Sequence, residues 1–243
     1  MGDRPRTVTV IISTFNEMGL GFLKCSLENL SKLKNINILC VDGGSSDGTI
    51  ELIKSYKVEL HSLINSSRAQ RLNLGITKAS SQMIFLHHPR SIIDPASLSY
   101  IVKNLDQLEW GALTHQFDVD SLLLRFTSWY SNNVRGRVRE IFYLDHCIFF
   151  RKSFAENDDH FVKEVDIFED TELSLMLKSY CVPLRLEGTS LTSATRFSTN
   201  GIWKQALLNQ VLKWKYYFKF NHKEMNKSYE KNTKLNSDYT TKD

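Results

Sequence analysis

The sequence has little of what would indicate a disulfide-bonded, secreted or membrane-spanning protein. Its four cysteines are widely spaced and form no CxxC pair, and Cys40 and Cys147 lie in apolar runs where buried free thiols are common. This usage predicts a reducing, cytoplasmic setting. The first six residues are polar, so we expect no signal peptide, and no apolar run reaches the roughly 18 residues of a membrane span.

A strong excess of charge of one sign is also missing. The formal net charge is only +4, which is too small to predict nucleic acid as a partner but fits a site for an anionic ligand or a patch that faces a membrane. With 42% hydrophobic residues, the 243-residue chain can bury a sizeable core. We expect one domain over residues 1–221 and a disordered polar tail over residues 222–243.

Short apolar runs alternate with segments of helical spacing through the first half. The expected strands are residues 7–13, 36–41, 58–63 and 83–86, and the expected helices are residues 20–33, 49–56 and 67–79. This alternation predicts an α/β fold, with a mostly parallel sheet covered by helices on both faces. The second half is less regular, with expected strands at 111–117, 144–151 and 182–186 and a helix at 171–179.

Three polar segments follow expected strands, at residues 14–17, 42–48 and 87–91. In an open α/β sheet, ligands bind outside the carboxyl ends of the strands, so these segments predict a binding site. Asp42 could accept hydrogen bonds from a nucleobase or a ribose. Equally, Asp42 and Asp47 could do no more than stabilise a tight turn.

Five motifs, in order, resemble those of the family 2 glycosyltransferases, which have the GT-A fold. They are VTVIISTFNE with VDGGSSDGT (residues 8–17 and 41–49), SRAQRLNLG (67–75), FLH (85–87), FEDTEL (168–173) and SATRF (193–197). The second motif is similar to the arginine-containing segment of a small bacterial subgroup. The resemblance covers residues 7–215 and implies an inverting glycosyltransferase that uses a nucleotide-sugar donor and a hydroxyl acceptor.

The resemblance also implies roles for individual residues. The donor would be bound by Thr14, Glu17, Asp42 and Arg68, and the acceptor pocket would include Asp145, Glu169 and Arg196. Asp170 would be the general base that takes the proton of the acceptor hydroxyl, a task that suits a carboxylate. Alternatively, Glu169 and Asp170 could simply cap a helix, because acidic residues stabilise the first turn.

One motif departs from the family. Pro89 occupies the place of the aspartate that binds the divalent ion, manganese or magnesium, in these enzymes. Either His87 or His88 could bind a metal instead, since imidazole is a good ligand. We favour a different replacement, in which Arg90 forks onto the phosphate oxygens. A third reading is a catalytically weakened or inactive homologue that binds the nucleotide or sugar and acts with a partner enzyme.

Residues 201–220 predict an amphipathic helix rich in aromatic residues and lysines. Such a helix can lie at a membrane interface, which would suit a lipid-linked acceptor and a peripheral location at the inner face of the membrane. Alternatively, the aromatic face packs on the sheet and is part of the core.

Overall fold

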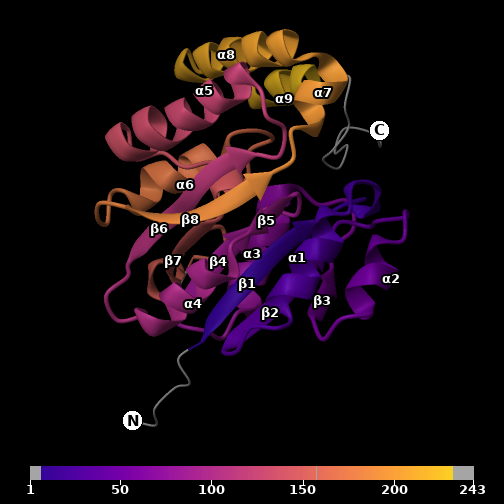
Figure 1. The fold of residues 1–243 in the computed structure, drawn as a ribbon, viewed down its shortest axis with the longest axis vertical. Coiled ribbons are helices and arrows are strands. Elements are labelled where there is room, and N and C mark those ends of the chain that lie inside the picture. Colours follow the sequence, from indigo (N-terminus) through magenta and orange to yellow (C-terminus); the bar gives the residue numbers. More distant parts are fainter. Residues whose placement is uncertain (1–6, 157, 232–243) are drawn as a thin grey trace.

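A curled sheet of eight strands runs through the computed structural model, which describes residues 7–156 and 158–231 (Figure 1). The strand order is β3-β2-β1-β4-β7-β6-β8-β5. The strands are β1 (Val8–Thr14), β2 (Ile36–Asp42), β3 (Glu59–Ser62), β4 (Met83–His87), β5 (Ser91–Ile93), β6 (Trp110–Phe117), β7 (Ile148–Arg151) and β8 (Leu184–Thr192). The predicted α/β architecture is confirmed.

The first four strands form a parallel unit with β1 at its centre. All seven residues of β1 are buried, as expected for a strand that is covered on both faces. Its register with β2 pairs Thr14 with Asp42, so the two side chains meet at the carboxyl ends of adjacent strands. Strand β7 joins β4 antiparallel, and four of the seven strand pairs in the whole sheet are parallel.

Helices cover both faces of the sheet. One apolar cluster joins α1, α2 and α4 to the first face, and another joins α3 and α6 to the second. These helices are α1 (Phe22–Leu30), α2 (Thr49–Lys54), α3 (Arg68–Lys78), α4 (Pro95–Lys103) and α6 (Glu169–Leu177). Short one-turn helices are η1 (Met18–Leu20), η3 (Leu144–His146) and η4 (Lys152–Ala155).

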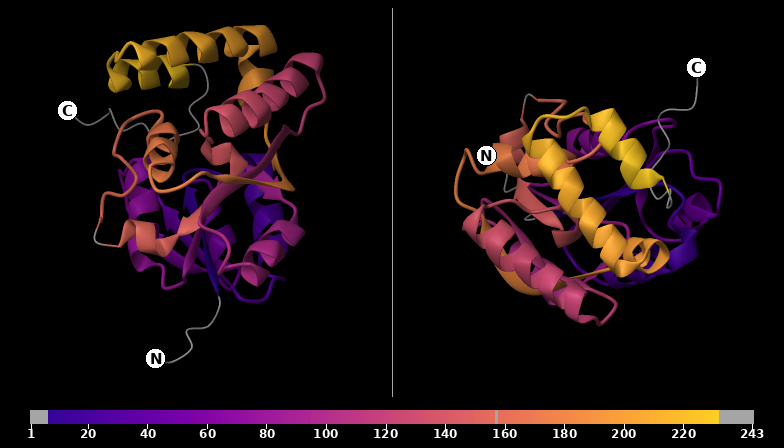
Figure 2. Two further views of the ribbon diagram at one scale, coloured as in Figure 1. Left: turned by 90° about the vertical axis from the view of Figure 1, so that its left-hand side faces the viewer. Right: turned by 90° about the horizontal axis from the view of Figure 1, so that it is seen from above.

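A further helical layer lies over one end of the sheet (Figures 1 and 2). It contains α5 (Leu122–Tyr130), the π-helical segment η2 (Ser131–Val138), α7 (Thr195–Asn200), α8 (Ile202–Tyr217) and α9 (His222–Glu230). The predicted disordered tail is therefore wrong over α9, because Met225 buries its side chain against Ile167 and Leu212. Residues 232–243 lie outside the described residues. Among the helices that the structure describes, none has the length and apolarity needed to cross a bilayer.

Candidate active site

Asp42 anchors the turn between β2 and α2. Its Oδ1 accepts hydrogen bonds from the backbone N–H groups of Gly44 and Ser45 at 2.9 and 2.8 Å, and its Oδ2 accepts from the hydroxyls of Ser45 and Thr14 at 2.6 and 2.8 Å. Gly44 and Gly48 have φ angles of 99° and 96°, which explains why this turn uses glycine. The turn-stabilising role of Asp42 is confirmed, while its contact with a nucleoside stays a prediction.

Glu17 and Arg90 form a buried ion pair across the same end of the sheet. The Arg90 Nε and Nη2 atoms each donate to a Glu17 carboxylate oxygen at 2.9 Å, a two-pronged geometry that favours a charged pair. Burial raises the pKa of Glu17 to about 7, although the Arg90 guanidinium opposes that rise. The arginine that we expected to fork onto phosphate therefore forks onto a neighbouring carboxylate in this structure.

Arg68, the other arginine that we predicted to bind the donor, also has a carboxylate partner. Its Nε donates to Oε1 of Glu169, whose side chain is almost completely buried in the first turn of α6. The pair joins the start of α3 to the start of α6, although these segments lie far apart in the sequence. Glu169 therefore holds Arg68 in place at the edge of a cavity.

This cavity, of about 380 Å³, lies between the sheet and the helical layer. Several residues that we predicted to bind the donor or to act on the acceptor line this cavity: Arg68, Arg90, Asp145, Asp170 and Arg196. Thr14, Glu17, Asp42 and Glu169 are buried beside it or behind it and do not line it. The structure therefore brings three predicted arginines and two predicted carboxylates to one space.

Asp170 lies in the cavity wall at the start of α6. Its Oδ2 accepts from the backbone N–H of Leu144 at 3.0 Å and its Oδ1 from that of Thr171 at 2.7 Å. Burial raises the pKa of Asp170 to about 6, and the charge of Glu169 adds to the rise. A carboxylate with such a pKa is ionised at neutral pH yet basic enough to accept a proton, so the geometry suits a general base.

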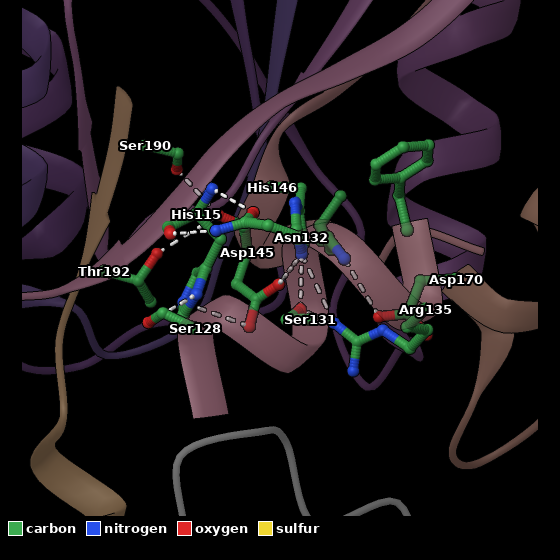
Figure 3. Close-up of polar contacts among 12 residues, drawn as sticks. His115, Ser128, Ser131, Asn132, Arg135, Asp145, His146, Asp170, Ser190 and Thr192 are labelled. Atoms are coloured by element: carbon green, nitrogen blue, oxygen red, sulfur yellow. Dashed lines mark hydrogen bonds and ion pairs between the residues drawn. The ribbon is translucent and has the colours of Figure 1, made fainter. Parts of the chain in front are cut away.

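Asp145 is the second carboxylate of the cavity, and histidines surround it (Figure 3). Its Oδ2 lies 3.6 Å from His115 Nε2, and its Oδ1 lies 4.0 Å from His146 Nε2. Burial would raise the pKa of Asp145, but His115, His146 and Arg135 bring it to about 2. The cavity therefore holds one carboxylate that stays ionised and one that can exchange a proton near pH 6.

Hydrogen bonds fix the tautomer of His146. Its Nδ1 lies 3.0 Å from the carbonyl oxygen of Leu113 and must carry the proton, so Nε2 is left to accept from the Ser131 hydroxyl at 2.7 Å. Burial lowers the pKa of His146 to about 3, so the ring is neutral. Arg135 donates to the same serine hydroxyl and stacks over the Tyr143 ring at 3.3 Å.

The residues at the family's metal position do not fit a divalent ion. His88 lines the cavity, and burial together with the charges of Arg90 and Arg68 lowers the pKa of its ring well below 6.5, which leaves the ring neutral and able to coordinate. The same two guanidinium groups, however, would repel a metal cation. His87 is fully buried in β4 and does not line the cavity. Within residues 7–156 and 158–231, no cluster of three or more His, Cys, Asp or Glu side chains could hold a metal.

Arg196 reaches the cavity but is also tied to α9. Its guanidinium lies 4.0 Å from the centre of the Tyr229 ring and donates to the Tyr229 carbonyl oxygen at 3.1 Å and to the Glu230 carboxylate. Helix α9 thus closes one side of the space that we predicted for the acceptor.

Several site residues were not predicted from the sequence. His115, Tyr143, Arg135 and Lys213 line the cavity from four separate elements or loops, and no motif connects them. Arg71 is buried at the donor end, where it donates to the Ser13 hydroxyl and to the Ser66 carbonyl oxygen, each at 2.7 Å. Of these residues, only Arg71 could have been found from the sequence, because it places a charged side chain on the apolar face of an expected helix.

A sheet with this strand order, with the cavity beyond the end of β4, defines a nucleotide-sugar transferase fold of the GT-A type. The family model described as glycosyl transferase family 2 matches residues 9–176, more than half of the chain. The chain therefore belongs to glycosyl transferase family 2. No curated protein matches it in sequence.

Solved structures share the fold at low sequence identity. The mannosyltransferase PcManGT from Pyrobaculum calidifontis, in complex with GDP-Man and Mn²⁺, has a TM-score of 0.61 and 16% identity over 87% of this chain and 63% of its own. TarS 1-349 of S. aureus, in complex with UDP-GlcNAc, has a TM-score of 0.53 and 13% identity over 77% of this chain and 56% of its own. The chain thus spans less than two thirds of either relative.

Proposed function

We propose that the protein transfers a sugar from a nucleotide-sugar donor to a hydroxyl group of an acceptor held in the cavity, with inversion. The acceptor oxygen attacks the anomeric carbon and the bond to the donor diphosphate breaks. The nucleoside diphosphate leaves, and the acceptor proton passes to Asp170. The observation that carries the proposal is the position of Asp170 in the cavity wall, with a raised pKa and with Arg68 lining the same cavity nearby.

The donor phosphates would lie at the arginine end of the cavity. Arg68 and Arg90 line it there, next to His88 and the carboxyl end of β4. Fixed guanidinium groups can neutralise a leaving diphosphate in the way a bound ion does, and they bind phosphate oxygens with directed hydrogen bonds. Because the side chains at the metal position do not fit a divalent ion, no step of the proposal passes through one.

The acceptor would enter from the side opposite the arginines. Phe126, Tyr130 and Leu212 give this part of the cavity an apolar lining, while Asp145 and Asp170 make its interior polar. An amphiphilic acceptor would match both parts, so a lipid-linked acceptor at the inner face of the membrane remains part of the proposal. Asp145, which stays ionised, is suited to accept hydrogen bonds from acceptor hydroxyls.

The test is Asp170→Asn, measured by release of nucleoside diphosphate from UDP-sugars and GDP-sugars. We expect turnover to fall by about 100-fold or more, because asparagine cannot accept the proton. Affinity for the nucleoside diphosphate should stay close to that of the wild type. The matched control is Asp159→Asn, since Asp159 is exposed and does not line the cavity. Unchanged turnover in Asp170→Asn would remove Asp170 from the base role.

A second candidate is a homologue that binds the donor but turns it over weakly. Pro89 at the metal position and the pairing of both donor arginines with Glu17 and Glu169 favour it. Under this alternative, the wild type binds a nucleoside diphosphate but releases little or none of it from the sugar donor. Turnover that depends on Asp170 would decide against it.

A further inference from the structure

Helix α8 exposes the face that an ordinary surface helix would bury. Gln205 and Leu212 are only 1% and 2% exposed, whereas Trp203, Trp214 and Phe218 are 76%, 65% and 69% exposed. Together with Leu207 and Val211, these aromatic residues follow the spacing i, i+4, i+8, i+11 and i+15, which places them in one stripe along the helix. The sequence left open whether this stripe was core, and none of the residues that the structure describes covers it.

Helix α5 carries a second exposed stripe. Leu122, Phe126 and Trp129 are 85%, 59% and 53% exposed and follow the spacing i, i+4 and i+7. Large apolar side chains gathered in this way on a surface mark an interaction site. The rings of Phe126 and Trp129 stack with centroids 5.9 Å apart.

The two helices lie on the same side of the molecule (Figures 1 and 2). Lys213 Nζ of α8 lies 5.8 Å from the centre of the Tyr130 ring of α5, and Arg139, which follows η2, donates to the Tyr217 hydroxyl of α8 at 3.1 Å. We call the outward residues of both helices the two-helix surface. They are Leu122, Phe126, Trp129, Trp203, Leu207, Val211, Trp214 and Phe218.

The charge of these elements has one sign. Helix α5, the segment η2 and helix α8 contain no aspartate or glutamate, although they have 9, 8 and 16 residues. Their partly or fully exposed basic residues are Arg125, Arg137, Lys204, Lys213 and Lys215, of which Arg125 forms an ion pair with Asp120 just before α5. Aromatic rings with basic side chains around them are the combination that an anionic lipid surface attracts, because the rings enter the headgroup region and the cations stay with the lipid phosphates.

The cavity connects with this surface. Phe126, Thr127 and Tyr130 of α5 and Asn209, Gln210 and Lys213 of α8 line it. Because Phe126 lines the cavity and is also 59% exposed, the cavity reaches the outside between the two helices.

We propose that the two-helix surface docks on the headgroup region of a bilayer that contains anionic lipid. Docked in this way, the protein presents the opening of its cavity to the headgroups. The inference goes beyond the proposed transfer reaction, since docking needs no donor and no turnover.

The test uses the full chain and vesicles of phosphatidylcholine, with and without phosphatidylglycerol, in a flotation assay. Three of the four tryptophans, Trp129, Trp203 and Trp214, belong to the surface, and Trp110 is 1% exposed, so tryptophan fluorescence reports docking directly. We expect flotation and a blue shift with the anionic vesicles, and much weaker binding to phosphatidylcholine alone. Trp203→Ser with Trp214→Ser should lower the vesicle partition coefficient by about tenfold or more.

The matched control is Ile64→Ser with Val182→Ser, which removes apolar residues that are 68% and 76% exposed elsewhere and should leave binding unchanged. Nucleoside diphosphate affinity of the tryptophan variant should equal that of the wild type, which also shows that it folds. If the protein transfers no sugar, vesicle binding should still be observed, so a failure of the transfer proposal can be told from a failure of the docking proposal. Docking is overturned if the wild type binds no anionic vesicle, if the tryptophan variant binds as well as the wild type, or if sedimentation shows that the surface instead joins two copies of the chain.

Discussion

The centre of the first half and the cavity side of the second half bury different kinds of residue. In the first half, β1, β2 and β4 fill the centre with apolar side chains and carry their hydrogen-bonding groups mainly at the strand ends. Beside the cavity, the second half buries His115, Asn132, Arg135 and His146. The difference indicates that packing holds the centre of the first half together, whereas hydrogen bonds between side chains shape the second half where it borders the cavity.

The largest effect that would test this contrast is expected in β1. Ile11 is fully buried against α3, so Ile11→Ala should lower the free energy of unfolding by about 3–4 kcal/mol. Urea unfolding measures the change. Ile64→Ala, at a side chain that is 68% exposed, is the control and should cost less than about 0.5 kcal/mol. A similar decrease in the free energy of unfolding in both variants would contradict the role of packing.

A smaller but specific effect is expected in the second half. The Asn132 side chain accepts from the His115 N–H and donates to the His115 carbonyl oxygen, each at 2.9 Å, as a neighbouring strand would. Asn132→Ala leaves the backbone N–H and carbonyl groups of His115 buried without this partner and should lower the free energy of unfolding by about 2 kcal/mol. Asn133→Ala, next in the chain, removes only a bond to the Trp129 carbonyl oxygen at the helix surface and should cost less. If Asn132→Ala lowers the free energy of unfolding no more than Asn133→Ala does, the buried polar groups do not stabilise this half.

The smallest effect is a dependence of turnover on pH that belongs to the second half alone. Because burial raises the pKa of Asp170 to about 6, its basic form is lost as the pH falls through 6. We expect kcat/KM to fall about tenfold per pH unit below that point and to level off above it. Asp145 and His146, with pKa values of about 2 and 3, do not titrate there.

The affinity for a nucleoside diphosphate, which we assign to residues of the first half, should not follow the same dependence on pH. A change in that affinity near pH 7 would report Glu17 instead, since burial raises the pKa of this residue to about 7. A rate profile that is flat between pH 5 and 7 would contradict the role of Asp170.

The contrast also explains how much of the fold was predicted from the sequence. The apolar runs of β1, β2 and β4 are local signals, so these strands were predicted to within a residue or so of their ends. Helices α4 and α5 were missed. The outward stripe of α5 removes the pattern of one buried and one exposed face that makes a helix recognisable. Helix α9 was missed because a single buried methionine, Met225, anchors a segment that is otherwise polar.

The site was predicted unevenly for a related reason. The sequence predicted Arg68, Arg90, Asp145, Asp170 and Arg196 as site residues, and all of them line the cavity. It could not show that Arg90 pairs with Glu17 or that Arg68 pairs with Glu169, because these contacts join residues that are 73 and 101 positions apart. Such pairing follows from the way the chain closes and leaves no local trace in the sequence.

The central claim is that side chains of this protein, and no bound metal, hold the diphosphate of a nucleotide-sugar donor. Calorimetric titration with UDP and with GDP, in EDTA and then with added manganese, tests it most directly. The account predicts that one of the two binds in EDTA and that manganese adds little. Binding that appears only with manganese, or no binding of either nucleotide under both conditions, would contradict it.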